Sequence, residues 1–494
     1  MTINKSMNIS LTGLKANQAA LNVVSHNIAN MNTEGYAKQR VSFSESRVPV
    51  TDNTVSAYIG SLSGVKIAGI TSSSNNSLNN YYRNQLAKAD GLQKEADIAG
   101  QIADLTDELT GTGLGDSITD FLNAANSLNQ DPTNYSLRVN FAGKAKQAAS
   151  KFNTVYSNLE SYRTSIVGNG ISLSSASNSE LGAYVNELNQ SLTSLADINK
   201  RLSSGSGDAS LETERDAILK NISSLAGVTV VLESSGAANV KIGNTDLVSN
   251  NAVVNSLKLN PDATISAVDK DNNEKDITSD FTGGKVGGIF KGLATVDRTI
   301  SSINTLASGF ADYMNDIQTY VNGDIKAASY DRENDILVDS SEPLFTTSDG
   351  SATFTAANIQ VNSNVYNKPD LIAAARIDTS DPDNYRAVGN SDNALEFYNA
   401  KTATNISGLG GLTMQDYILG VSTKAALESN SAQAAADNQN AIAQSVYNQI
   451  LSETSVNLDE ELSNMIMYRQ AYNASARVFS TCVEIFDTLL ALGT

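Results

Sequence analysis

The sequence predicts a mainly α-helical protein with β-rich insertions, whose two chain ends form a coiled-coil core domain around which a helical-bundle body is built. Apolar residues recur every seven positions near both termini, and short β-type runs interrupt the helical stretches only in the middle of the chain. Only 6 of the 494 residues are Pro, which leaves room for long helices.

The C-terminal segment carries the clearest pattern. Two seven-residue series alternate at four and three positions over nearly five heptads, broken only at Arg469, which is typical of a coiled-coil seam. One helix over 457–491 would be about 50 Å long. The first series is Leu458, Met465, Tyr472, Phe479 and Phe486, and the second is Leu462, Arg469, Ala476, Val483 and Leu490.

The N-terminal segment is a weaker copy of this pattern. Its seven-residue series is Met7, Leu14, Leu21 and Ile28, and the turn signal at 32–35 predicts the end of the helix. Neither terminal segment has a core of its own. We therefore expect residues 1–40 and 455–494 to form one domain, packed against each other and against other copies.

The interior reads as a helical body with two insertions. Val228 to Leu232 begins a series of short β-type runs with Gly, Asn and Asp turns, which ends at a glycine cluster before residue 289. The expected helices are 105–128, 137–166, 181–202, 211–225, 289–321 and 425–451. The predicted division is a helical body domain (41–227, 285–321 and 411–454), a β-rich insertion (228–284) and a second irregular or β insertion (322–410).

Composition excludes several classes of function. The net charge of −19 argues against nucleic-acid binding and against an anionic membrane surface. No run approaches 18 apolar residues, and the first 14 residues lack the apolar region of a cleaved signal peptide. With a single His and a single Cys, we predict no catalytic residues, no metal site and no cofactor.

Two weak alternatives stay open at this point. Cys482 and His26 could form a nucleophile pair, but an antiparallel pairing of the end helices with Met7 beside Leu490 would hold them apart. Asp269, Asp271 and Asn273 have the spacing that opens a calcium loop, although the sixth and twelfth positions do not fit. A solvated turn explains the second pattern more simply.

Both chain ends resemble the flagellar axial protein family. Residues 25–40 read SHNIANMNTEGYAKQR, similar to the signature NNIANxNTxGY of rod, hook and hook-associated proteins, with His26 and Glu34 as mild departures. Gln39-Arg40-Val41 and the C-terminal stretches 456–462 and 468–477 favour the hook-associated members. Arg469 stands where that family usually has Gln. The resemblance covers nearly the whole chain and is strongest over about 40 residues at each end.

The signature also has a physical interpretation. Asn27 and Asn30 lie on one helical face, so their amides could bond to neighbouring backbone groups in a dense tube of helices. Gly35 could bend the chain and Tyr36 could anchor the bend. Sequence chemistry alone favours a generic helix cap with a buried Tyr, and the family resemblance reverses that preference. The predicted assembly interface comprises Met7, Leu14, Leu21, Asn27, Ile28, Asn30, Thr33, Gly35, Tyr36, Leu458, Leu462, Met465, Tyr472, Phe479, Val483, Phe486 and Leu490.

The resemblance implies a non-catalytic structural subunit of the extracellular bacterial flagellum, at the junction between hook and filament. It implies self-assembly into a ring, with hook protein below and a second junction protein above. It also implies export by the flagellar type III apparatus, with a chaperone on the C-terminal helix. A hook or distal rod protein of the same family is the alternative. A secreted enzyme on this scaffold would need a metal-peptidase motif such as His-Glu-x-x-His, which is absent, and a plain coiled-coil adhesin would not need the Asn-Thr-Gly-Tyr signature.

Overall fold

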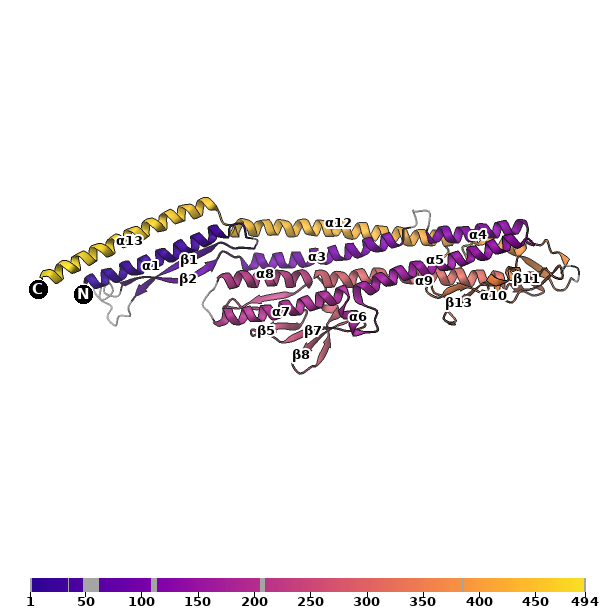
Figure 1. Cartoon of the computed structure of the whole chain (residues 1–494), viewed down its shortest axis with the longest axis horizontal. Coiled ribbons are helices and arrows are strands. Elements are labelled where there is room, and N and C mark those ends of the chain that lie inside the picture. The colour runs from indigo at the N-terminus through magenta and orange to yellow at the C-terminus, as the bar shows by residue number, and fades with distance from the viewer. Residues whose placement is uncertain are drawn as a thin grey trace.

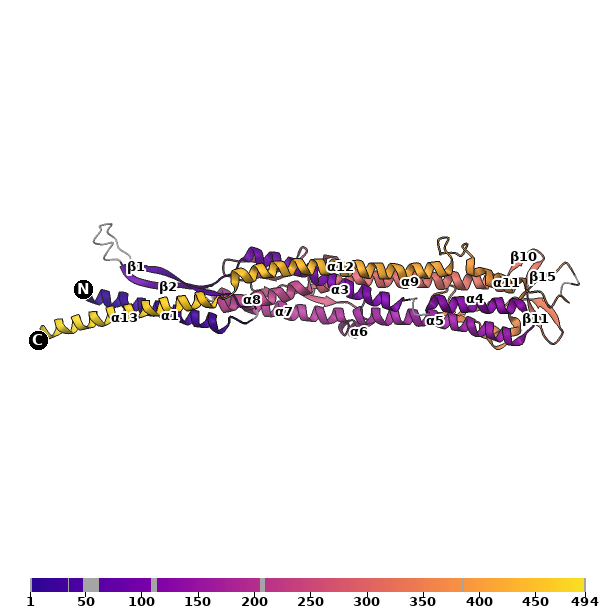
Figure 2. The ribbon, with the colours of Figure 1, turned by 90° about the horizontal axis from the view of Figure 1, so that it is seen from above.

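The protein is an elongated rod with both chain ends at the same tip (Figure 1). This computed structural model describes residues 2–33, 35–47, 62–107, 113–204, 209–381, 383 and 386–492. The terminal helices and one β-hairpin form the narrow end, long helices form the shaft, and β-sheets lie along one side and at the far end (Figures 1 and 2). This confirms the predicted class, mainly α with β insertions.

The narrow end consists of α1 (Thr2–Ala29), α13 (Leu458–Leu492) and the antiparallel strands β1 (Gln39–Arg47) and β2 (Leu62–Ser72). We call these four elements the terminal unit. The two helices run antiparallel, with Gly13 beside Ser475. In the pairing considered from the sequence, Met7 lies beside Leu490, and the observed register differs from that pairing by several residues. Polar contacts where α1 ends and α13 begins determine the observed register.

The hairpin β1–β2 packs against α1. The residues after 40 were expected in the helical body, whereas the structure holds residues 39–72, outside the undescribed stretch 48–61, beside the terminal helices. The alternation of Val41 and Phe43 with serines is a local signal for a strand, but it is too short to show where the strand packs.

Long helices with polar caps form the shaft. Asn75 caps α3, Asn134 caps α5 and Thr413 caps α12, each through its side-chain oxygen. The helices are α3 (Asn76–Leu105), α4 (Leu114–Gln130), α5 (Tyr135–Val167), α6 (Leu173–Ser177), α7 (Glu180–Ser204), α8 (Ala209–Leu225), α9 (Gly284–Gln318), α11 (Asp392–Asn399) and α12 (Met414–Thr454).

Two helix predictions need correction. The stretch 105–128 is not one helix, because α3 ends at Leu105 and α4 begins only at Leu114. The last body helix begins at Met414 rather than near 425, because Thr413 and Asp416 make a reciprocal cap: the Asp416 amide donates to the Thr413 hydroxyl at 3.1 Å. The apolar pattern of that first turn is short, so the periodicity did not reveal it.

Six phenylalanines make the centre of the shaft's core. They come from four helices and from the second insertion, so segments up to 276 residues apart in sequence meet there. Ring centroids lie between 4.8 and 6.2 Å apart in the contacting pairs, within the range of favourable aromatic contacts. The six are Phe121, Phe141, Phe152, Phe310, Phe345 and Phe397.

The helices α3 and α9 cross at very short range. A Cβ on Gly288 would lie 2.2 Å from the backbone oxygen of Gly91, which only glycine permits. Gly292 similarly faces Ile98. The glycine cluster that marks the end of the first insertion in the sequence is therefore the first turn of α9 and its contact with α3.

The first insertion forms two small antiparallel sheets. One has the order β3-β4-β5-β6 and the other β7-β8-β9. The strands are β3 (Thr229–Leu232), β4 (Ala238–Ile242), β5 (Thr245–Ser249), β6 (Ala252–Val253), β7 (Asn255–Leu259), β8 (Ile265–Asp269) and β9 (Glu274–Asp276), followed by η1 (Thr278–Asp280).

The second insertion is a mixture of strands and short helices. Strand β11 pairs with β10, β12 and β15, and β13 pairs with β14. Residues of both insertions belong to the same hydrophobic cluster as the helices. The elements are β10 (Val321–Asn322), β11 (Ile325–Asp331), β12 (Ile336–Asp339), β13 (Phe345–Thr347), β14 (Ile359–Val361), α10 (Ser363–Asn367), η2 (Pro369–Leu371), β15 (Ala375–Asp378) and η4 (Ala400–Thr402).

Candidate assembly site

Asn27, at the C-terminal end of α1, is the centre of a buried polar network. Its amide nitrogen donates to the Gln39 carbonyl at 2.9 Å and to the Glu461 carboxylate at 3.1 Å. Its oxygen accepts from the Gln39 backbone N–H at 3.0 Å and from the Tyr36 hydroxyl at 2.7 Å. One side chain thereby joins α1, the start of β1 and the first turn of α13.

The turn after α1 brings Tyr36 back onto the helix. Gly35 has φ +77°, in the left-handed region that glycine adopts without strain. The Tyr36 hydroxyl also contacts His26 Nδ1 at 2.9 Å. Burial, and secondarily the charge of Glu461, raise the pKa of Tyr36 to about 12, so the phenol is protonated and able to donate at neutral pH.

Asn30 and Thr33 do not reach the network. The Asn30 amide donates to the carbonyl of His26 within its own helix at 2.9 Å, and the Thr33 hydroxyl lies 3.4 Å from the Asn30 oxygen. The two asparagines of the signature therefore differ: Asn27 makes tertiary contacts, whereas Asn30 makes a local cap. Their spacing in the sequence places both asparagines on one helical face and does not distinguish their contacts.

Charged groups reinforce the same junction. Buried Lys38 lies 2.7 Å from Glu460 and 3.2 Å from Glu461, and its backbone N–H donates to the Thr454 carbonyl at 2.9 Å. The hydrogen bond and the charge of Lys38 lower the pKa of Glu460. The last turn of α12 and the first turn of α13 are thus held against the linker that leaves α1.

The predicted seam residues fall into two groups. Met7, Leu14, Leu21 and Ile28 on α1 are partly buried. Met465, Tyr472, Phe479 and Val483 on α13 are also partly buried, whereas four predicted residues are largely exposed: Leu458, Leu462, Phe486 and Leu490. Pairing of α1 with α13 thus covers only part of the apolar surface. That these residues form an interface between copies stays a prediction.

A second apolar face of α13 lies outside the two seven-residue series. Met467, Val478, Ile485 and Leu489 are 51, 52, 46 and 52% exposed. Their spacings of eleven, seven and four residues return to one side of a helix, about 110° from the side that faces α1. Between 458 and 491 no apolar side chain of α13 is fully buried. We call Met467, Val478, Ile485 and Leu489 the free face.

The geometry does not support the Cys482–His26 nucleophile pair or the calcium loop at Asp269. Since Asn27 meets Glu461, Cys482 lies some 20 residues along α13 from the level of His26, a distance of about 30 Å. The Asp269 carboxylate accepts from Asp271 and Asn273 in the tight turn between β8 and β9. Within the described ranges, no group of three or more His, Cys, Asp or Glu residues is arranged to hold a metal ion. No described helix is long and apolar enough to cross a membrane.

Replacement of Asn27 by Leu is expected to destabilise the chain by about 3 kcal/mol, because the Gln39 N–H, the Gln39 carbonyl and the Tyr36 hydroxyl lose a buried partner. Denaturant unfolding followed by circular dichroism measures the effect. Asn30→Leu is the matched control, with an expected change below about 1 kcal/mol. Equal losses in both variants would contradict the distinction between the two asparagines.

Family models match three parts of the chain. The flagellar hook-associated protein FlgK helical domain matches residues 99–323. The flagella basal body rod protein model matches residues 7–36, and the flagellar basal body rod FlgEFG protein C-terminal model matches residues 448–492. The two terminal matches cover α1 with its signature and the end of α12 with α13.

Relatives and a solved structure extend this similarity. The chain is 22% identical to flagellar hook-associated protein 1 of Salmonella typhimurium, over 98% of this chain and 99% of the relative. It is 23% identical to the protein of that name from Bacillus subtilis, over 97% and 96%. The flagellar hook junction protein FlgK from Burkholderia pseudomallei has a similar fold, with a TM-score of 0.58 at 13% identity over 75% of this chain and 99% of that one.

The order of the three matched models follows the order of the elements, and the similarity runs through both ends, the shaft and the insertions; the chain therefore resembles hook-associated proteins of the FlgK type along nearly its whole length.

Proposed function

We propose that this chain is a structural subunit of the bacterial flagellum that forms the junction between hook and filament. The exposed apolar surface of the terminal helices is the observation that carries this proposal. Among the described side chains of α13, nine large apolar ones are at least 38% exposed in the single chain: Leu458, Leu462, Ile466, Met467, Val478, Ile485, Phe486, Leu489 and Leu490. Burial of such a surface against neighbouring copies would stabilise an assembly.

Assembly in this proposal is coiled-coil packing of terminal helices from adjacent copies. Each copy contributes a preformed α1–α13 pair with an apolar outside. The Asn27 network holds the two helices together, and the hydrogen bond from the Lys38 N–H to the Thr454 carbonyl ties them to the shaft. Copies then complete one another in a ring, with hook protein on one side and a second junction protein on the other. The net charge of −19 opposes association of free chains until the apolar faces meet.

Export and localisation follow from the same proposal. The chain would leave the cell through the flagellar type III apparatus and act in the extracellular flagellum. An export chaperone that covers the C-terminal helix would shield the apolar face of α13 before assembly. FlgK-type proteins are structural, and we assign this chain no enzymatic activity.

Electron microscopy of cells that lack the gene tests the proposal against its alternative. We expect hooks of normal length without attached filaments, and filaments restored by a plasmid copy. Cells without hooks would instead indicate a hook or distal rod protein, the alternative role within the axial family. Normal filaments in the deletion strain would refute both roles.

A further inference from the structure

A cavity of about 530 Å³ lies where the terminal unit meets the shaft. Five parts of the chain contribute to its wall: the linker after α1, the end of β2 with the residues that follow it, the first turns of α3, one face of α8 and the last turns of α12. Its volume is in the range of pockets that hold a small ligand or a few side chains. The lining includes Tyr82, Arg83, Asp216, Ala217 and Tyr447.

One wall of the cavity is apolar and aromatic. The rings of Tyr82 and Tyr447 lie 5.3 Å apart, and Leu86, Ile450 and Leu451 extend the wall. Leu451 is 38% exposed and lies on α12 just before the junction with α13. The apolar wall therefore reaches the last turns of α12, a few residues before α13 begins at Leu458.

The cavity is also lined by Arg83, whose guanidinium is incompletely hydrogen-bonded. Arg83 is only 5% exposed, and its Nε has no hydrogen-bond partner among the described residues. One of its other nitrogens bonds to Asn80, and Nη1 lies 3.9 Å from the Asp216 carboxylate. That same carboxylate oxygen accepts from Arg215 Nε at 3.0 Å and Nη2 at 2.9 Å. Asp216 thus bonds to Arg215 and lies only at ion-pair distance from Arg83, so the Arg83 Nε stays without a partner in the described part of the chain.

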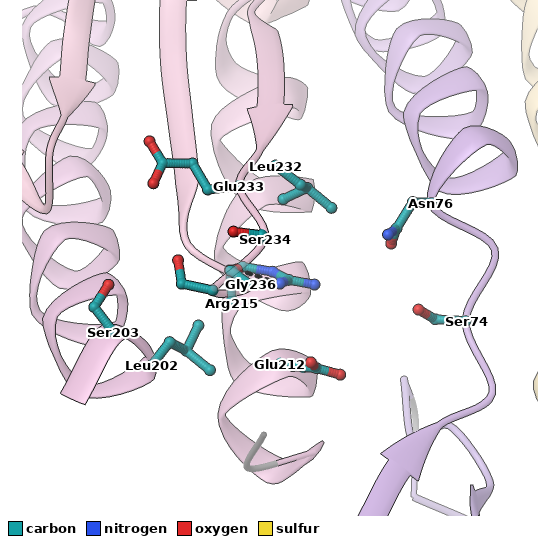
Figure 3. A pocket seen from close by; sticks show the side chains of 11 residues that line it. Ser74, Asn76, Leu202, Ser203, Glu212, Arg215, Leu232, Glu233, Ser234 and Gly236 are labelled. Carbon is teal, nitrogen blue, oxygen red and sulfur yellow. Dashed lines mark hydrogen bonds between the residues drawn. The ribbon is translucent and has the colours of Figure 1, made fainter. Parts of the chain in front are cut away.

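A neighbouring cavity of about 490 Å³ provides a contrast (Figure 3). It is lined by Arg215, whose guanidinium bonds to the Gly236 carbonyl and to Asp216, and by the carboxylates of Glu212 and Glu233. The guanidinium of Arg215 already has hydrogen-bond partners, and two carboxylates already line this cavity. Of these two cavities, the Arg83 cavity alone combines an unsatisfied buried donor with an apolar wall.

An ionised carboxylate is the ligand that suits this donor, because guanidinium–carboxylate pairs make strong, planar, charge-assisted hydrogen bonds. The apolar wall requires that the carboxylate come with an apolar neighbour, as on a protein segment. The chain has 53 acidic residues against 34 basic ones, so acidic side chains are abundant on its own surface. The wall of the cavity ends at Leu451, seven residues before Leu458, whose exposed side chain our proposed function assigns to contacts between neighbouring copies.

We propose that the Arg83 cavity receives an Asp or Glu side chain, with an adjacent apolar residue, from a second copy of this chain. The guanidinium of Arg83 binds the carboxylate, and the Tyr82–Tyr447 wall covers the apolar neighbour. This inference rests on the proposed function, since it requires that copies assemble side by side. It adds a polar contact at the base of the terminal unit to the apolar contacts of α13.

Photo-cross-linking in intact flagella tests the proposal. A photoreactive benzoylphenylalanine replaces Ala217, an exposed residue of α8 that lines the cavity. Flagella that carry this full-length chain are irradiated, and the cross-linked peptides are identified by mass spectrometry. We expect chain dimers, with the cross-link within about two residues of an Asp or Glu of the second copy. Cross-links only within one copy, or to a different protein, would overturn the proposal.

Substitutions then test the role of Arg83. Arg83→Met is expected to lower the yield of cross-linked dimer about tenfold, the equivalent of one charged contact of about 1.4 kcal/mol. Ala217→Trp fills the cavity from the surface and is expected to reduce junction assembly. The matched control is Ala183→Trp, at an exposed residue of α7, which should leave junction assembly unchanged. An unchanged dimer yield in Arg83→Met, or normal assembly in Ala217→Trp, would overturn the proposal.

The outcomes separate this inference from the proposed function. If flagella assemble normally with Arg83→Met and Ala217→Trp but fail with substitutions on the free face of α13, the cavity proposal fails and the junction role stands. If free glutamate raises the melting temperature of the isolated chain and no cross-link to a second copy forms, the site belongs to a small carboxylate and the proposal also fails.

Discussion

The triple variant Met467→Glu, Val478→Glu and Ile485→Glu should fold normally and fail to enter the flagellum. All three side chains are about half exposed on the free face of α13, so glutamates there remain solvated in the single chain. In an assembly they would be buried without partners, at a cost of several kcal/mol. Each kcal/mol of this cost reduces incorporation of the chain several-fold. We therefore expect electron microscopy to show no filaments on cells that carry the triple variant.

A matched variant carries the same added charge on the polar side of α13. Gln470, Thr481 and Thr488 are exposed, and their replacement by Glu adds three negative charges without placing them on the free face or on the side of Leu462 and Ile466. We expect this variant to restore filaments in the deletion strain. Loss of filaments in both variants would attribute the effect to net charge or to export, and would remove the free face from the interface.

Replacement of Gly288 by Val should strongly destabilise the shaft. A Cβ there would lie 2.2 Å from the Gly91 oxygen and 2.9 Å from the Lys94 Cβ, so α9 and α3 would have to separate. Overpacking of a core typically costs about 1–3 kcal/mol, and a clash with backbone puts this site at the upper end or above it. Thermal unfolding by circular dichroism should show a melting temperature lowered by roughly 6 °C or more.

Gly143→Ala is the control for this prediction. Gly143 is an exposed glycine of α5, and a Cβ at this position would meet nothing within 4 Å. Alanine should stabilise that helix by up to about 1 kcal/mol because glycine has the lower helix propensity. If both glycine variants shift the melting temperature equally, the close approach of α3 and α9 is not a stability determinant.

The helices of the shaft and the strands of the first insertion could be predicted because their signals are local. Residues 181–202 and 211–225 were expected as helices from apolar spacing alone, and α7 and α8 are found within two or three residues of those limits. The hairpin β1–β2 was not expected, because its packing against α1 joins segments whose patterns do not identify each other.

The candidate site was predictable only in part. Asn27, Gly35 and Tyr36 were selected from the signature, and Glu461 lies in the C-terminal stretch 456–462 that also supported the resemblance. Nothing in either stretch pairs Glu461 with Asn27, which lies 434 positions away. Arg83 is similar: in the sequence it is one arginine on a polar helix face, and its burial beside Asp216 results from the packing of α8 on α3.

The sequence by itself determined that both ends are amphipathic helices, since heptad spacing is a property of neighbouring residues on one helix. It also determined that the chain has few groups for catalysis, with one His and one Cys. Only the tertiary structure decided the register of α1 on α13, the burial of Asn27 and Arg83, and which apolar face stays exposed. Those features depend on long-range contacts between segments, and the free energy of such contacts is not encoded in any single stretch of sequence.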